Sequence, residues 1–182
     1  MNETDEVLYE RYLLRSDENA FRLLLERYRE RLTLFLDSYV HNLSDAEDLM
    51  IDAFAVAASG TAKFRGKSSF KTWLYGIGRN LAKNHLRKHR FRPDALSENT
   101  AAAPVDYGIL QEERYLQLYT ALANISEDYR QVLYLLYFEE LSESETAAVT
   151  GKSRKQIYNL VSRGRNALRT ELERMGFDYA QY

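Results

Sequence analysis

The residues able to carry out chemistry are few in this 182-residue chain. It has no cysteine, which excludes thiol nucleophiles, disulfides and thiolate metal sites. It has neither a glycine-rich phosphate loop nor the His-Glu-x-x-His pattern of zinc hydrolases. His85 and His89 stand four residues apart, a spacing that could bind a metal, but the surrounding tract offers no acid to complete the site. We therefore expect no catalytic residue, no metal and no cofactor.

Binding of a polyanion is the chemistry that the sequence does suggest. Residues 63–92 contain ten Lys or Arg and no acid, and residues 152–169 contain six and no acid. The remainder is acidic, with thirteen acids against six bases in residues 1–62 and eleven against two in residues 93–151. Because solvated surfaces usually mix both signs, two such tracts on a chain of net charge −2 indicate two separate contacts with nucleic acid.

The elements that must position these tracts are helical. The chain has only eight Gly and two Pro, is 45% apolar, and has no segment that alternates as a strand would. Helices are predicted over residues 5–14, from a cap at Ser16–Asn19 to Tyr39, and over residues 44–58, 70–89, 109–123, 126–138, 142–149 and 153–175.

The predicted fold class is all-α, with two small helical domains and a helix-turn-helix in the second. The domains cover residues 1–91 and 109–182, and a flexible linker at residues 92–108, which holds both prolines, joins them. The N-terminus is charged, and no stretch reaches the roughly 20 apolar residues that a bilayer span needs. We expect a cytoplasmic protein with no membrane insertion of its own.

Capping signals define the helix-turn-helix. Ser142-x-x-Glu145 and Ser153-x-x-Gln156 are capping boxes for two consecutive helices, and Gly151 supplies a left-handed turn between them. Helix, glycine-containing turn and helix is the spacing of a DNA-binding motif. A third capping box, Ser44-x-x-Glu47, is predicted to open helix 44–58.

The last helix separates into two faces. Its inward stripe comprises Ile157, Leu160, Val161, Gly164 and Leu168. A major groove admits such a helix, and its first turns reach base edges. The base-reading candidates are Arg154, Lys155, Tyr158, Asn159 and Ser162, and the phosphate-binding candidates are Arg163, Arg165 and Arg169. The alternative is a helical hairpin with a solvated basic face.

The first basic tract mixes cations, hydroxyls and aromatic rings between Lys63 and Tyr75, a composition that suits single-stranded nucleic acid. A polar ridge follows on one side of the next helix, formed by Asn80, Lys83, Asn84, Arg87 and Lys88. The alternative for the aromatic residues is core packing, since Phe70, Trp73, Leu74 and Ile77 have helical spacing.

Both regions resemble a known family. Residues 45–54, DAEDLMIDAF, and 63–88, KFRGKSSFKTWLYGIGRNLAKNHLRK, resemble region 2 of extracytoplasmic-function (ECF) sigma factors, which direct bacterial RNA polymerase to promoters. Residues 125–169 resemble their region 4. The resemblance implies a non-enzymatic protein whose partners are core RNA polymerase, at its clamp and flap, promoter DNA and an anti-sigma factor.

The resemblance also implies roles for individual residues. Helix 44–58 would grip the polymerase clamp through Asp48, Leu49, Asp52 and Phe54. The minus-10 element would be held by Phe64, Arg65, Lys67, Ser68 and Ser69, where a flipped base is captured, and by Asn80, Lys83, Asn84, Arg87 and Lys88. The minus-35 element would be read by Arg154, Lys155, Tyr158, Asn159, Ser162, Arg163 and Arg165.

Two other classes of protein remain open. An ordinary helix-turn-helix regulator that binds duplex DNA by itself would account for residues 142–169 but leaves 63–88 without a purpose. A protein-interaction module that regulates transcription without touching DNA would account for the acidic segments but not for the two basic tracts.

Overall fold

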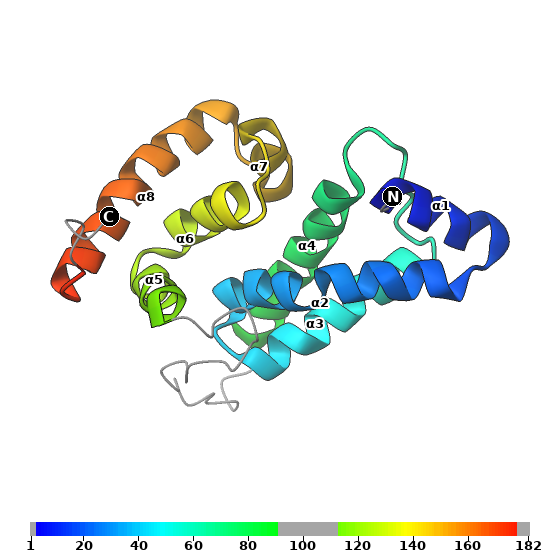
Figure 1. The fold of residues 1–182 in the computed structure, drawn as a ribbon, viewed down its shortest axis with the longest axis horizontal. Helices are drawn as coiled ribbons and strands as arrows, with labels where there is room; N and C mark the ends of the chain where they lie inside the picture. The colour runs from blue at the N-terminus through cyan, green and yellow to red at the C-terminus, as the bar shows by residue number, and fades with distance from the viewer. Residues whose placement is uncertain (1–2, 91–112, 178–182) are drawn as a thin grey trace. The chain divides into compact units, whose positions relative to one another are not determined.

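Residues 3–90 and 113–177 are described by the computed structural model of the protein (Figure 1). The N-terminal part contains α1 (Asp5–Arg15), α2 (Glu18–Val40), α3 (Leu43–Ala58) and α4 (Phe70–Arg90). The C-terminal part contains α5 (Glu113–Asn124), α6 (Glu127–Leu133), the π-helical turn η2 (Tyr134–Phe138), α7 (Glu143–Thr150) and α8 (Arg154–Arg174). These residues include no β-strand, which confirms the predicted all-α class.

The described helices form two compact units. One is built around α1 to α4 and the other around α5, α6, η2 and α8. The predicted linker, residues 92–108, and the predicted start of the second domain at residue 109 lie outside the described residues, so the domain boundaries remain predictions. No helix in the described ranges has the length and apolar character needed to cross a membrane.

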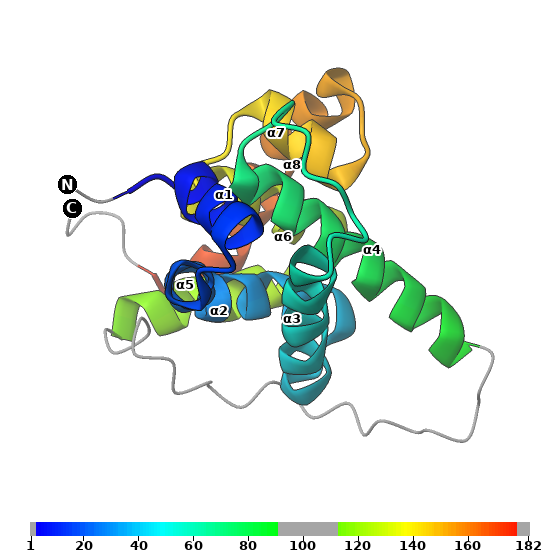
Figure 2. The same cartoon turned by 90° about the vertical axis from the view of Figure 1, so that its right-hand side faces the viewer.

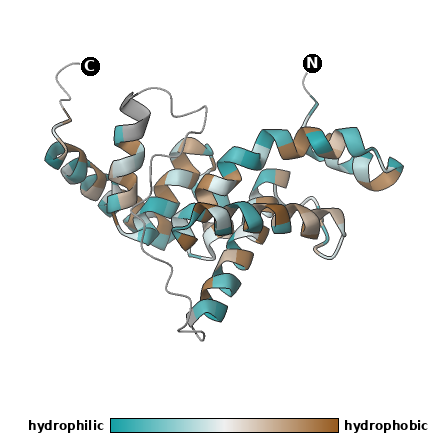
Figure 3. Cartoon of the chain, turned by 90° about the horizontal axis from the view of Figure 1, so that it is seen from below, coloured by the Kyte–Doolittle hydropathy of each residue, from teal (hydrophilic) through white to brown (hydrophobic). Residues whose placement is uncertain are grey.

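The core of the N-terminal unit lies where α2, α3 and α4 pack together. The buried residues of α3 recur at the helical period and are Ala46, Leu49, Met50, Ala53, Phe54 and Ala57. Along α2, the buried face includes Leu24, Tyr28, Leu32, Phe35, Leu36 and Tyr39. Figure 3 shows the same division, with hydrophobic and hydrophilic residues alternating around the helices.

Side-chain caps set the ends of these helices. Asp17 is the N-cap of α2, as predicted, and its Oδ1 accepts a hydrogen bond from Ala20 N at 3.1 Å. The predicted capping box at the start of α3 is wrong. The helix begins at Leu43, and Asn42 is the N-cap, with its Oδ1 3.0 Å from Asp45 N. Asn caps at least as well as Ser, and the left-handed His41 that ends α2 leads directly into an extended Asn42.

Two glycines in α4 have different surroundings. A Cβ on Gly78 would lie 3.2 Å from Leu32 Cδ1 and 3.3 Å from Leu36 Cδ2, so the missing side chain lets α4 approach α2 closely. A Cβ on Gly76 would meet no atom within 4 Å. Close packing thus accounts for a glycine at position 78, and nothing in the structure accounts for the one at 76.

Helices α7 and α8 form the predicted helix-turn-helix. The capping box at Ser153 is present, with Ser153 N donating to Gln156 Oε1 at 2.8 Å. At Ser142, the backbone N donates to Glu145 Oε2 at 3.0 Å, and Glu145 N donates back to the Ser142 hydroxyl at 3.3 Å. Gly151, with φ of 66°, makes the left-handed turn between α7 and α8. These features confirm the motif.

A π-helical turn interrupts the helix predicted over residues 126–138. Regular α-helix ends at Leu133, and η2 adds one wider turn. Tyr134 and Leu135 remain buried, while Tyr137 turns outward and is 51% exposed. Residues 132–138 are all apolar or aromatic, so their spacing could not distinguish this turn from a continued α-helix.

Candidate nucleic-acid interface

The loop between α3 and α4, residues 59–69, presents several exposed polar side chains around a glycine turn. Gly66 has φ of 65°, a conformation that favours glycine, and open space lies where its Cβ would be. Arg65, Lys67 and Ser68 are exposed, and Ser69 is partly buried. The loop therefore offers cations, hydroxyls and an unobstructed backbone on one short segment.

Phe64 anchors this loop to the rest of the unit. Its ring packs against Tyr9, Trp73 and Phe70, with centroid distances of 5.8, 5.2 and 6.1 Å. Core packing, the alternative weighed for the aromatic residues, describes Phe64 and Phe70, whose side chains are partly and fully buried. Phe64 thus holds the loop against the aromatic rings of the unit, and its contact with the minus-10 element remains a prediction.

The predicted ridge of α4 is present. All five of its members, Asn80, Lys83, Asn84, Arg87 and Lys88, have exposed side chains. Arg87 Nη2 donates to Asn84 Oδ1 at 3.3 Å, which links two ridge residues one turn apart. Figure 2 shows the last turns of α4 projecting beyond α2 and α3, so the ridge is open along its length. Its arrangement provides donors and positive charge for a phosphate backbone.

The histidine pair lies next to the ridge and close to one acid. The His85 and His89 rings lie 4.2 Å apart, and α3 brings Asp45 Oδ2 to 3.4 Å from His85 Nε2. This acid belongs to α3 and lies outside the basic tract of residues 63–92. Among the described residues, no group of three or more His, Cys, Asp or Glu could hold a metal ion.

The outer face of α3 is acidic with one apolar residue at its centre. Asp48, Ile51 and Asp52 are exposed, and Ile51 is 58% exposed. Leu49 and Phe54, predicted to contact the polymerase, are 5% and 4% exposed and pack into the core. The predicted docking residues thus divide into two exposed acids and two core residues, and Ile51, one turn from Asp48 and next to Asp52, was missed.

The recognition helix α8 has the two faces expected of it. Ile157, Val161 and Gly164 are buried, and Leu160 and Leu168 are partly buried against the core. The eight polar candidates on the other face are all exposed, namely Arg154, Lys155, Tyr158, Asn159, Ser162, Arg163, Arg165 and Arg169. Tyr158, at 66% exposed, is a large aromatic side chain with no packing role. The residues predicted to read bases and those predicted to bind phosphates therefore share one exposed face of α8.

Tyr137 of η2 holds one of these arginines. Its hydroxyl accepts from Arg165 Nε at 2.5 Å and from Arg165 Nη2. Arg165 Cζ lies 5.3 Å from the centroid of the Tyr137 ring. The sequence analysis missed this contact because it depends on the π-helical turn, which orients Tyr137 toward α8 and leaves no separate signal in the hydrophobic pattern.

Comparisons with known proteins identify both units. The family model of Sigma-70 region 2 matches residues 24–92, and that of Sigma-70, region 4 matches residues 115–168. The RNA polymerase sigma-H factor of Pseudomonas aeruginosa is 31% identical over 184 residues, which cover 94% of this chain and 95% of that protein. The ECF RNA polymerase sigma-E factor of Escherichia coli K12 is 31% identical over 183 residues, with 93% and 95% covered.

Solved structures agree with this assignment. The sigma factor RpoE, in complex with the anti-sigma factor NepR from Bartonella quintana, matches with a TM-score of 0.68 and 29% identity over 84% of this chain and 96% of that one. CnrH, in complex with the cytosolic domain of CnrY, shares the fold, with a TM-score of 0.66 and 22% identity over 94% of this chain and 98% of that one. The chain therefore belongs to the sigma-70 family, as an ECF-type sigma factor that directs RNA polymerase to specific promoters.

Proposed function

We propose that the two units read two promoter elements in different states. The C-terminal unit reads the minus-35 element as duplex through α8. The N-terminal unit holds one strand of the opened minus-10 element through the loop at residues 64–69 and the ridge of α4. The observation that carries this division is that the exposed polar side chains of the loop and of the ridge belong to one acid-free tract of the sequence, residues 63–92, for which a duplex-binding regulator has no use.

The duplex-reading role of α8 rests on shape and charge. Its first two turns present Arg154, Lys155, Tyr158, Asn159 and Ser162, where a helix end enters a major groove. Arg163 directly follows Ser162, and Arg165 lies three residues beyond it, so both are placed deeper in the helix, where we assign them to phosphates at the groove edge. The Tyr137 hydroxyl restricts the conformations of the Arg165 guanidinium. Less side-chain entropy is then lost when Arg165 binds a phosphate.

The strand-holding role of the N-terminal unit rests on the loop and the ridge together. Extruding a base from a duplex costs a few kcal/mol, which a fitted loop can offset. Arg65, Lys67 and Ser68 supply donors, and Gly66 lets the backbone of the strand come close. The ridge then continues this contact along the strand. Phe64 contributes indirectly in this scheme, by fixing the loop that does the binding.

Docking on core polymerase is assigned to the outer face of α3 and to the C-terminal unit. Asp48 and Asp52 flank Ile51, a pattern that fits a partner surface with basic residues around an apolar pocket. We assign this face to the polymerase clamp and the C-terminal unit to the flap, so that promoter elements are read at a fixed spacing. Leu49 and Phe54 support the face from inside.

An anti-sigma factor is the proposed regulatory partner. A solved relative at 29% identity is a sigma factor bound to an anti-sigma factor, which supports this class of partner for the present chain. The protein supplies recognition and strand opening, and the polymerase supplies the chemistry, so the protein itself needs no catalytic residue or cofactor. Because its partner is RNA polymerase, we place its action in the cytoplasm.

Single substitutions can separate these roles. Asn80→Ala removes an exposed ridge side chain of α4, whereas the proposed docking face is formed by α3. We expect it to slow open-complex formation by about fivefold, the effect of losing roughly one hydrogen bond, and to leave core binding unchanged. Asp52→Ala is the matched control, expected to weaken core binding and to leave strand contacts intact.

Permanganate reactivity of unpaired thymines would report opening, and fluorescence anisotropy with labelled protein would report core binding. If Asn80→Ala abolished binding to core polymerase, the proposed division of labour would be wrong.

A further inference from the structure

Helix α1 contacts the strand-binding loop at its start, its middle and its end. At the start, the Tyr9 hydroxyl donates to Ala57 O at 2.8 Å, in the last turn of α3. In the middle, the Tyr9 ring meets Phe64 edge-on, at 5.8 Å between centroids and 83° between planes. At the end, Glu6 Oε1 accepts from Phe70 N, the first residue of α4, at 2.8 Å. Glu6 and Tyr9 are about one turn apart, so a single turn of α1 contacts the residues on both sides of the loop and Phe64 within it.

The Glu6 contact completes the N-terminus of α4. The first N–H groups of a helix have no partner within the helix, and the local cap residue Ser69 accepts one of them, from Thr72 N at 3.2 Å. The Glu6 carboxylate receives a second, and its negative charge is favourable at the positive end of the helix dipole. The start of the helix that carries the ridge therefore depends on a residue 64 positions earlier in the chain.

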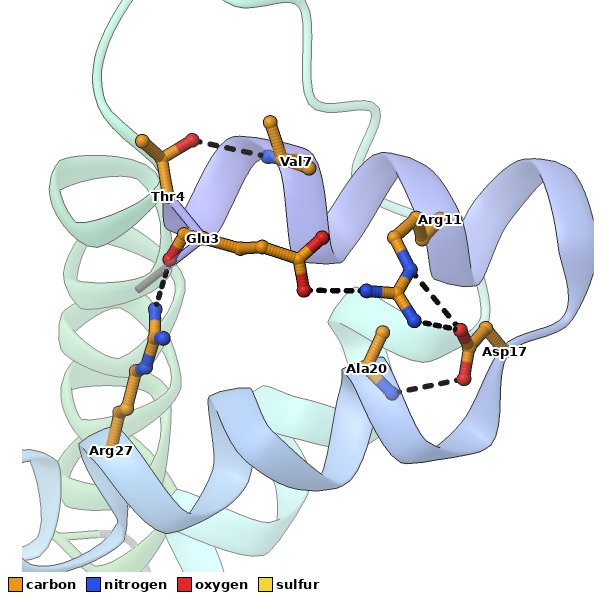
Figure 4. Close-up of polar contacts among 7 residues, drawn as sticks. All are labelled: Glu3, Thr4, Val7, Arg11, Asp17, Ala20 and Arg27. Carbon is orange, nitrogen blue, oxygen red and sulfur yellow. Dashed lines mark hydrogen bonds and ion pairs between the residues drawn. The ribbon is translucent and has the colours of Figure 1, made fainter. Parts of the chain in front are cut away.

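Helix α1 is in turn fixed to α2 by charged groups. Figure 4 shows Arg11 joined to Glu3 Oε2 at 2.5 Å and to Asp17 Oδ2 through its Nε at 3.1 Å. Arg27 of α2 donates to Glu3 O at 3.0 Å and to Asp5 Oδ1 at 2.6 Å. The hydrogen bond from Arg11, together with that from Ala20 N, lowers the pKa of Asp17. The turn of α1 that carries Glu6 and Tyr9 is thus held against α2 by these hydrogen bonds and ion pairs.

We propose that α1 is a positioning element for strand capture, and that Glu6 and Tyr9 are its positioning residues. This helix lies outside the part of the chain that matches Sigma-70 region 2, residues 24–92. Glu6 and Tyr9 touch no DNA in this scheme. They hold loop 59–69 and the first turn of α4 in the arrangement that receives the strand. The inference rests on the proposed role of the loop in holding the opened strand.

The test uses holoenzyme reconstituted from core polymerase and the full-length protein. The probe is fork DNA built on a promoter found by mapping transcription start sites with the wild-type protein. Its upstream element is duplex, and its non-template strand is unpaired across the downstream element. A second set of probes carries a single abasic nucleotide at each unpaired position. The variants are Glu6→Ala, Glu6→Gln, which keeps an oxygen acceptor, and Glu10→Ala, an exposed acid on the same helix.

With wild-type protein we expect one abasic position to weaken fork binding by about tenfold, as for the loss of about one hydrogen bond between the loop and the captured base. Glu6→Ala should weaken binding of the intact fork by about fivefold and reduce the abasic effect to about twofold, since a misplaced loop gains less from the base. Glu6→Gln should restore most of the wild-type fork affinity and most of the wild-type abasic effect. Glu10→Ala should behave as wild type.

Three results would overturn the inference. A full abasic effect in Glu6→Ala would refute positioning by α1 while leaving strand capture intact. If Glu6→Ala weakened binding to core polymerase, or to duplex upstream DNA, as much as it weakened fork binding, Glu6 would be a general structural residue. If wild-type protein showed no abasic effect at any position, the proposed capture by the loop would fail, and the role of α1 with it.

Discussion

Replacing Tyr9 by Phe removes one buried hydroxyl and keeps the aromatic ring. Tyr9 is 1% exposed, and its hydroxyl donates to the Ala57 carbonyl at 2.8 Å. Without it, that carbonyl is left with a long hydrogen bond from Gly60 N at 3.4 Å. A hydrogen bond between neutral groups contributes about 0.5 to 1.5 kcal/mol, so Tyr9→Phe should lower the free energy of unfolding of the N-terminal unit by about 1 kcal/mol.

Tyr12→Phe is the matched control. Its hydroxyl lies 3.5 Å from the next carbonyl, that of Ala58, at the limit of hydrogen bonding and only partly buried. The same substitution on the same helix should therefore cost less than about 0.5 kcal/mol. Burial effects common to both tyrosines cancel in the comparison.

Urea unfolding followed by tryptophan fluorescence would measure both variants. Trp73 is the only tryptophan in the sequence, and its ring lies 5.3 Å from that of Tyr9, so its emission reports the N-terminal unit. We expect a lower midpoint for Tyr9→Phe at an unchanged slope, and a midpoint close to wild type for Tyr12→Phe. Equal losses in the two variants would refute the assignment of a specific Tyr9–Ala57 bond.

Three further predictions follow from the structure. Gly76→Ala should stabilise the N-terminal unit by about 1 kcal/mol, and Gly78→Ala should gain less because of its contact with Leu32; equal gains in urea unfolding would contradict this. Arg163→Ala should weaken promoter binding by holoenzyme and reduce the slope of log K against log salt by about 0.9, and an unchanged slope in a salt titration would argue against a phosphate contact. Hydrogen bonds from Arg174 and Asn124 lower the pKa of Glu171 from 4.5 to about 2. The ionised Glu171 therefore stabilises the fold above pH 4.5, and this stabilisation is lost as the pH falls toward 2. Thermal unfolding at several pH values should show that Glu171→Gln removes this pH dependence.

Local patterns predicted the helices and the recognition motif well. The inward residues of α3 follow the helical period without exception, because each of them packs in the core. The capping boxes at Ser142 and Ser153 need only neighbours within three residues, so sequence spacing was sufficient to find them. The same spacing was misleading at Ser44, where Asn42 caps the helix first.

Contacts between distant segments could not be predicted in this way. The bond from Phe70 N to Glu6 and the packing of Phe64 on Tyr9 depend on how α1 lies across the loop. The burial of Leu49 and Phe54 followed from the helical period, yet their assignment to a docking surface came from the resemblance to relatives, which does not separate surface residues from those that support them.

Transcription with purified core polymerase tests the central claim most directly. Start sites would be mapped on a genomic promoter library, with core alone and with core plus this protein. We predict new, discrete start sites that share two upstream elements at a fixed spacing. The absence of new start sites with several core enzymes, together with tight binding of the protein alone to duplex DNA, would contradict the account and indicate an ordinary helix-turn-helix regulator.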